Sequence, residues 1–345
     1  MQMITDLIDP AEHTGYARDF LSVFAENRFT LRRWFPTNTT DDLEFKIRTG
    51  ARVDVDAAEF RAFDTPSTMT GRQGITEKRG SIPPLGRAWP VGEEEMIRLR
   101  GVQAGSQQPL IDSIYDDTRN AMRSIAARLA YAQGDVLVDG IVTISENGLQ
   151  LTADFGMPAG HKVTAAIAWT VANAATAVPI TNLLAWQETA ATDGEALDRM
   201  LISRSKLGAL QVNAEFRAYA SSNGTTPQRV NLDTINGILS SEGLPQVEVY
   251  DEKVQIRGVT TRIIPDNYAI LLPDPGTRKL GETMYGVTAE SVALVEGGYI
   301  DARDASGAVA VVMQNAHPMQ TFTVGNALAL PLLGDPTVHF AANIG

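Results

Sequence analysis

The clearest pattern of hydrophobic positions in the chain is helical and lies between residues 109 and 133. Small and apolar side chains recur there at steps of three or four residues, which is the spacing of one helix face. These positions are Ile111, Ile114, Thr118, Met122, Ile125, Leu129 and Ala132. Pro109 suits the first turn and Gly134 the end of such a helix. We therefore predict a helix about 40 Å long, at about 1.5 Å per residue, that buries this face.

Alternation of apolar and polar side chains predicts strands on both sides of this helix. Over Leu43–Val55, alternate residues such as Phe45 and Ile47 share one face, which is typical of a half-buried strand. Val136–Val142 and Leu149–Phe155 flank an Asn-Gly turn. This arrangement predicts a β-hairpin directly after the long helix.

The other patterns are shorter and predict a chain of mixed helices and strands. Residues 1–29 read as an arm with a short helical piece at Asp19–Ala25. Helices are expected at Ile180–Thr192, Ser203–Tyr219 and Leu232–Glu242, a strand at Met200–Ser203, a hairpin of Val247–Tyr250 with Lys253–Ile256, a strand at Tyr268–Leu272, and a strand-like tail at Gln320–Ile344 broken by Gly334-Asp335-Pro336.

Residues 57–92 differ from the rest of the chain. They are rich in Gly and Pro, poor in large apolar side chains, and carry five cations against three anions. The cations are Arg61, Arg72, Lys78, Arg79 and Arg87, and the anions are Glu59, Asp64 and Glu77. So long a loop without structure is unusual inside a compact domain. We therefore expect an extended, two-stranded arm that reaches away from its own core, the alternative being a disordered loop.

Composition excludes several classes of function. The 345 residues carry 29 Lys and Arg against 41 Asp and Glu, a net charge of −12, which disfavours a clamp for nucleic-acid phosphates. Cysteine is absent, which removes disulfides, thiolate metal sites and a cysteine nucleophile. The four histidines are scattered, and no phosphate-binding loop or nucleophile elbow occurs. We expect a soluble protein with no membrane partner, no catalytic residues, no metal site and no cofactor.

The order of the parts resembles a known family. Arm, strand, long basic loop, long helix, hairpin, mixed domain and returning strands follow one another as in the major capsid proteins of tailed phages. More narrowly, the chain resembles the lambda-type capsid protein E family, which has the Hong Kong 97-type shell fold. The segments that carry this resemblance are Val136–Gly140 leading to Asp154–Gly156, Trp169 followed by Pro179–Leu183, Ile264–Leu271, and Gln320–Phe322 continuing through Ala329–Pro336.

The resemblance implies an α+β subunit of four parts. These are an N-terminal arm (1–43), an extended β loop with flanking strands (44–100), a peripheral domain with a long spine helix (101–162 and 291–345), and an axial domain (163–290). It further implies a structural protein, not an enzyme. Such a protein self-assembles into hexamers and pentamers that form the icosahedral head around phage double-stranded DNA. Its expected location is the virion, and the host cytoplasm during assembly.

The same resemblance suggests partners and contact residues. The chain shows no long, charged helical region at its start, so we expect a separate scaffolding protein, together with a portal protein; a decoration protein is left open. Contact with packaged DNA is expected to be non-specific. The candidate residues for contacts between subunits are the loop's Arg72, Lys78, Arg79, Arg87 and Trp89, and the acidic Glu93, Glu94, Glu95, Asp116 and Asp117.

Two alternatives stay open at this level. A cellular nanocompartment shell of the same fold would enclose protein instead of DNA. A soluble small-ligand enzyme would need a polar cluster in a pocket, which the sequence alone does not display.

Overall fold

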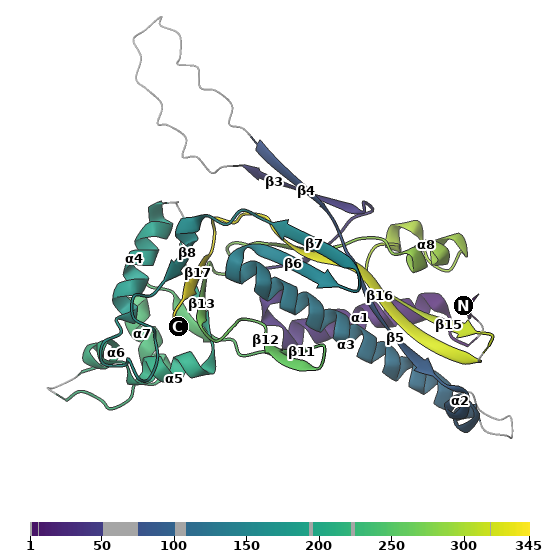
Figure 1. The fold of residues 1–345 in the computed structure, drawn as a ribbon, viewed down its shortest axis with the longest axis horizontal. Coiled ribbons are helices and arrows are strands. Elements are labelled where there is room, and N and C mark those ends of the chain that lie inside the picture. Colours follow the sequence, from purple (N-terminus) through teal and green to yellow (C-terminus); the bar gives the residue numbers. More distant parts are fainter. Residues whose placement is uncertain are drawn as a thin grey trace, which may run out of the picture.

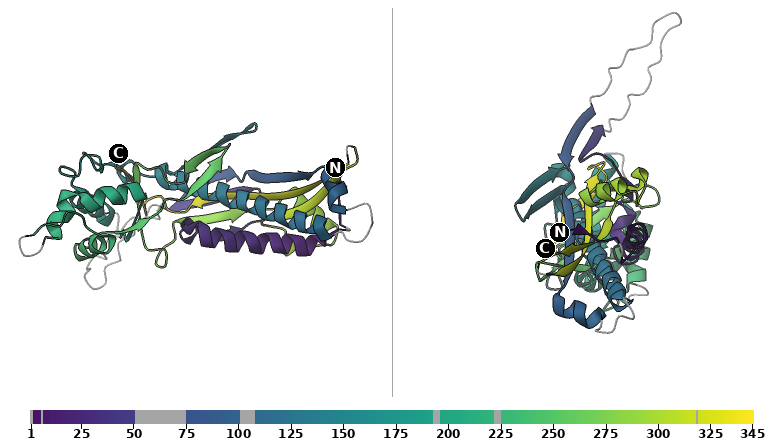
Figure 2. Two further views of the ribbon diagram at one scale, coloured as in Figure 1. Left: turned by 90° about the horizontal axis from the view of Figure 1, so that it is seen from below. Right: turned by 90° about the vertical axis from the view of Figure 1, so that its right-hand side faces the viewer.

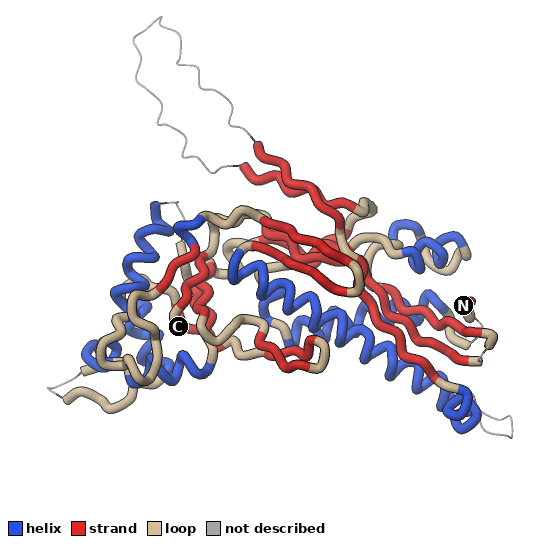
Figure 3. The backbone as a smooth tube through the Cα atoms, in the orientation of Figure 1, coloured by secondary structure: helices blue, strands red, loops and turns tan. Residues whose placement is uncertain are grey.

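The computed structural model describes residues 2–5, 7–50, 75–100, 108–192, 196–221, 225–317 and 319–345. The protein is elongated. The helices α4 to α7, within residues 179–241, lie at one end, and β15 (Val309–Asn315) with α2 (Glu93–Arg100) lies at the other (Figures 1 and 2). A two-stranded ribbon projects from the middle of the body (Figure 3).

The long predicted helix is the spine of the body. It is α3, Gln108–Asp139, and its 32 residues correspond to about 48 Å. The predicted face is buried, with Ile114, Met122 and Ile125 at 1% exposure or less and Leu129 at 6%. The periodicity in the sequence therefore identified the packed side of the spine correctly.

The predicted end of this helix at Gly134 is wrong, as is the strand predicted to begin at Val136. Gly134 lies inside α3, where a Cβ atom would stand 2.2 Å from the carbonyl oxygen of Ile263. The glycine is needed for this close approach, not for a helix end. The helix ends instead before Gly140, whose φ of +72° suits a glycine.

A twisted sheet lies against α3 and forms the main core with it. Its strands run in the order β1, β15, β16, β14, β2. In addition, β5 pairs antiparallel with β16. The bounds are β1 Gln2–Met3, β2 Thr37–Thr39, β5 Pro84–Val91, β14 Gly281–Tyr285, β15 Val309–Asn315 and β16 Gln320–Leu333. The long β16 joins most of these strands, which is why the tail of the sequence reads as strand.

The N-terminal arm contains a longer helix than the sequence predicted. Helix α1, Pro10–Arg28, lies alongside α3 (Figure 2) and is followed by the short helix η1, Thr30–Arg33. A buried hydrogen bond of 2.7 Å joins Nε2 of His13 to Oγ1 of Thr118 on α3. Trp34 and Phe35 then enter the core completely.

The end of the body that carries α4 to α7 has its own sheet and its own core. Its strand order is β10, β9, β13, β17, β8. The bounds are α4 Pro179–Thr192, α5 Arg204–Val212, α6 Ala214–Tyr219, α7 Leu232–Ser241, β8 Lys162–Thr164, β9 Arg199–Ile202, β10 Gln246–Val249, β13 Tyr268–Leu272 and β17 Phe340–Asn343. Alternate residues of β13 face opposite cores: Ala269 and Leu271 enter the core with α4 to α7, whereas Ile270 and Leu272 enter the main core. The sheet thus connects the two cores. The limits of the axial domain at residues 163 and 290 stay a prediction.

Two predictions in this region are wrong in their pairing or extent. β10 does not form a hairpin with β11, Lys253–Ile256, but pairs in parallel with β9. β11 pairs instead with β12, Val259–Arg262, through a turn whose central residues both have positive φ. The helix predicted over 203–219 is two helices, because Asn213 ends α5 and caps α6 with its side chain.

The remaining elements lie outside the two large sheets. The predicted hairpin turn after the spine is confirmed at Asn147 and Gly148, both at positive φ, but its first strand is Ile141–Glu146 and not Val136–Val142. The bounds are β3 Glu44–Gly50, β4 Ile75–Ser81, α2 Glu93–Arg100, β6 Ile141–Glu146, β7 Leu149–Asp154, η2 Ala159–His161, α8 Ala289–Glu296 and η3 Ala302–Asp304.

Candidate assembly surfaces

Two of the candidate cations lie on the ribbon that leaves the body (Figures 1 and 3). The ribbon is an antiparallel pair of β3 and β4, from Glu44 opposite Ser81 to Gly50 opposite Ile75. Lys78 and Arg79 are consecutive on β4 and therefore point to opposite faces. The third candidate, Arg72, lies outside the described residues.

Lys78 already has a partner in its own chain. Its Nζ donates a hydrogen bond of 2.9 Å to the carbonyl oxygen of Asp154 at the end of β7. No local pattern in the sequence indicates this contact, since the two residues are 76 positions apart. The ammonium group of Lys78 therefore ties the ribbon to the hairpin.

Arg87 and Trp89 do not lie on the projecting ribbon. Both belong to β5, which pairs antiparallel with β16 from Leu328 opposite Pro84 to Thr321 opposite Val91. The expectation that residues 57–92 project as one arm is therefore wrong for this last part. The physical reason is apolar burial, because Val91 is 1% exposed and the half-buried Trp89 packs against the main core.

The Arg87 side chain covers the partly exposed ring of Trp89. The guanidinium carbon lies 5.4 Å from the ring centroid, within range of a cation–π contact. Both side chains lie on the same face of β5, since they are two residues apart. They form an exposed, cationic and aromatic spot on an edge strand of the body.

The acidic candidates Glu93, Glu94 and Glu95 begin α2. Glu93 accepts a hydrogen bond of 3.1 Å from the backbone N–H of Met319, and Glu94 forms an i,i+4 ion pair of 2.5 Å with Arg98. Acidic residues in a first turn also complement the positive end of the helix dipole. These carboxylates thus stabilise α2 locally and remain exposed to solvent.

The acidic candidates of the spine lie close to those of α2. Burial raises the pKa of the Asp117 carboxyl above its ordinary value, and the negative charge of Glu95 raises it further. Asp116 forms an ion pair with Arg119 one turn along α3. The structure therefore brings the two predicted groups of acids together, at the end of the body away from α4 to α7 (Figure 1).

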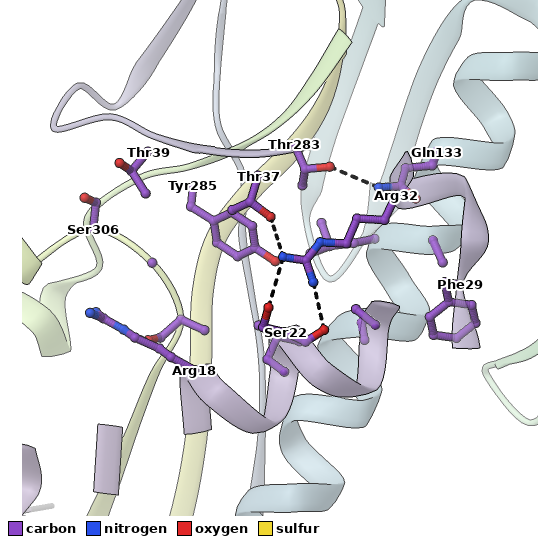
Figure 4. A pocket seen from close by; sticks show the side chains of 17 residues that line it. Arg18, Ser22, Phe29, Arg32, Thr37, Thr39, Gln133, Thr283, Tyr285 and Ser306 are labelled. Carbon is purple, nitrogen blue, oxygen red and sulfur yellow. Dashed lines mark hydrogen bonds between the residues drawn. The ribbon is translucent and has the colours of Figure 1, made fainter. Parts of the chain in front are cut away.

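A pocket of about 250 Å³ lies between α1, α3 and β14 (Figure 4). Its polar side chains bond mainly to one another. The Arg32 guanidinium donates to the carbonyl oxygen of Ser22, to its hydroxyl and to the hydroxyl of Thr37, and the Gln133 amide donates to Thr283. Burial raises the pKa of the Tyr285 hydroxyl to about 12, which makes it a poor general base or acid near neutral pH. The pocket secures the arm and offers no paired acid and base.

Other kinds of site are also missing from the part of the chain that the structure describes. No group of three side chains there could hold a metal ion. No helix within the same ranges is long and apolar enough to cross a membrane. What the described residues display instead is a projecting ribbon and exposed charged surfaces.

Comparisons with known proteins agree with this architecture. The family model described as phage major capsid protein E matches residues 30–344. The protein is also similar to the crystal structure of a candidate capsid protein from a prophage of Escherichia coli CFT073. The identity is 15%, the match covers 94% of this chain and 97% of that one, and the TM-score is 0.62. None of the curated proteins compared with the chain matches it.

A second solved structure supports the same fold. A phage-related protein from Bordetella bronchiseptica RB50 is 13% identical, with 95% of this chain and 96% of that one covered and a TM-score of 0.57. The family match includes the spine, the ribbon and every strand of the two sheets except β1. The protein has the Hong Kong 97-type phage capsid fold, belongs to the phage major capsid protein E family, and is a structural component of a virion shell, not an enzyme.

Proposed function

We propose that the protein forms hexamers and pentamers that close the icosahedral head of a tailed phage around double-stranded DNA. The observation that carries this proposal is the combination of the capsid-family match with a rigid body from which a ribbon projects. A ribbon of two strands is marginal in water without further packing, so neighbouring subunits supply its contacts. In this proposal the end with α4 to α7 lies nearest the centre of each ring.

Assembly requires partners beyond the subunit itself. We infer a separate scaffolding protein, which sets the curvature of the shell, and a portal protein at one vertex; a decoration protein is compatible with the same shell. Assembly takes place in the host cytoplasm. The net charge of −12 keeps contacts with the packaged DNA weak and independent of sequence, since like charges repel.

Electron microscopy of particles from a phage-producing host tests this proposal. DNA-filled, tailed particles that contain the chain in five- and six-membered rings are the expected result. Protein-filled particles without DNA would instead indicate a nanocompartment shell. A chain that stays monomeric in sedimentation, at high concentration and with its scaffolding protein present, would contradict the proposal.

The exposed charges suggest how neighbouring subunits attract each other. We propose that Arg72 and Arg79 of one ribbon approach the acidic end of a neighbouring body, formed by α2 and by Asp116 and Asp117. Single exposed ion pairs contribute only about 0–1 kcal/mol and weaken with salt. The contact repeats in every subunit, however, so small contributions add over the shell.

Reversing both charges tests this attraction. Arg72→Glu with Arg79→Glu should leave the subunit folded but lower the yield of particles, and the loss should be larger at low salt. Reversal of Asp116 and Asp117 to Lys in the same chain should recover part of the yield. Equal yields of wild type and the double variant at low salt would show that the ribbon is not held by charge.

A further inference from the structure

The ribbon of β3 and β4 joins the body at a hinge where Phe45 and Ile82 are both buried in the main core. The hinge is closed by the backbone hydrogen bond of 3.0 Å from Ile82 to Leu43. Next to it, Phe45 is only 5% exposed and belongs to the main core. Its ring covers Gly80, its partner across the ribbon, where a Cβ atom would lie 2.6 Å from the ring. Apolar contact of this kind is not directional, so it anchors the ribbon without fixing its angle.

Lys78 supplies a directional contact farther along the same side of the ribbon. It lies two residues from Gly80 on β4, so both face the same way. Its Nζ donates to the carbonyl oxygen of Asp154 at 2.9 Å, a charge-assisted hydrogen bond. Gly156 allows this approach, because a Cβ atom there would lie 2.8 Å from Nζ.

The acceptor of this bond belongs to a rigid part of the body. Oδ1 of Asp154 accepts a hydrogen bond of 2.7 Å from the backbone N–H of Gly156, which fixes the turn. The backbone N–H of Phe155 donates at 3.0 Å to the carbonyl oxygen of Gly140, directly after the spine helix. Phe155 itself is 3% exposed. Lys78 thus connects the ribbon to the end of α3 through one short segment.

We propose that Lys78 is a positioning residue whose bond to Asp154 sets the angle at which the ribbon leaves the body. At about 3.3 Å per residue, Lys78 lies about 10 Å from the base of the ribbon, and Ile75 about 20 Å. A shift of about 1 Å at Lys78 therefore becomes about 2 Å at Ile75 by lever action. This role rests on the proposed function, in which the ribbon must meet a neighbouring subunit at a defined place.

The angle of the ribbon can be measured directly in isolated subunits. The chain has no cysteine, so Thr76→Cys on the ribbon and Asn120→Cys on α3 can each carry one spin label. Lys78→Met keeps a chain of similar length but removes the donor. Lys46→Met is the matched control, because it removes the same charge from the same ribbon. Lys46 forms an ion pair with Asp42 instead of a contact with the hairpin. A broader or shifted distance distribution is expected for Lys78→Met alone, with Lys78→Arg closer to wild type.

Shell formation supplies the second measurement. Lys78→Met should lower the yield of closed shells several-fold, whereas Lys46→Met should not, and both variants should unfold at the wild-type denaturant concentration. An unchanged distance distribution in Lys78→Met overturns the proposal, and so do equal shell yields for the two variants. If wild-type subunits form no shells at all, the proposed function fails, while the distance measurement still decides whether Lys78 sets the angle.

Discussion

Replacing Gly134 by alanine sets two physical effects against each other. Gly134 lies within the spine helix, where alanine is favoured over glycine by about 1 kcal/mol. Helix propensity alone therefore predicts that Gly134→Ala stabilises the protein. The tertiary structure predicts the opposite, because the new Cβ would stand 2.2 Å from the carbonyl oxygen of Ile263 and 2.7 Å from its Cγ2.

The size of the opposing effect follows from what can move. The nearest atom belongs to the backbone, so no side-chain rotation relieves the contact, and α3 must shift from the segment between β12 and β13. Inserting a methyl group into a packed core costs about 1–3 kcal/mol. Because the obstacle here is backbone, the cost of Gly134→Ala should lie near the upper end of this range, at about 3 kcal/mol. Subtracting the gain in helix propensity leaves a net loss of about 2 kcal/mol.

Gly237→Ala is the matched control. Gly237 lies in the exposed side of helix α7, and a Cβ atom there meets no other atom within 4 Å. This variant should gain up to about 1 kcal/mol. Urea unfolding of isolated subunits should therefore order the midpoints as Gly237→Ala, wild type, Gly134→Ala. A Gly134→Ala protein at least as stable as wild type would refute the close approach of α3 to Ile263.

Two further predictions concern the body. Ile125→Ala should lower the free energy of unfolding by about 2–5 kcal/mol, because Ile125 is 1% exposed, whereas Ile97→Ala, at a position 65% exposed, should change it little; equal urea midpoints for the two variants would place the packed face of α3 elsewhere. The contribution of two buried histidines to stability should also fall between pH 6.5 and about pH 4, whereas Asp135, whose pKa burial raises to about 6, contributes in the opposite sense. Burial lowers the pKa of His13 and of His339 from 6.5 to about 4, so the unfolded chain binds protons in this range that the folded chain does not. Urea midpoints followed against pH should be level above pH 6.5, and His13→Gln should make the acid slope shallower; a slope unchanged in that variant would show that His13 is not buried in its neutral form.

The sequence proposes candidate residues for contacts between subunits but not their arrangement in space. The acids of α2 and of the spine were predicted separately, and the structure places Glu95 near enough to Asp117 to raise its pKa. Arg87 and Trp89 were assigned to the loop because Gly and Pro surround them. The pairing of β5 with β16 decides otherwise, and it joins residues more than 200 positions apart.

The sequence by itself determined those features that depend on neighbouring residues. The buried face of α3 follows from its period, the turn at Asn147 and Gly148 from conformations that those residues tolerate, and the start of α5 from the cap at Ser203. Each of these rests on an energy that acts within a few positions of the chain. Such patterns can be recognised without knowing which other segments pack against them.

Only the tertiary structure decided how distant segments meet. The sequence predicts a helix end at Gly134, but the close contact with Ile263 explains this glycine. The sequence also predicts a hairpin that contains β10, but β10 pairs with β9. Lys78 reads as a free surface cation until the carbonyl oxygen of Asp154 lies within 2.9 Å. The physical reason is that close packing and hydrogen bonding act over a few ångströms in space, whatever the separation along the chain.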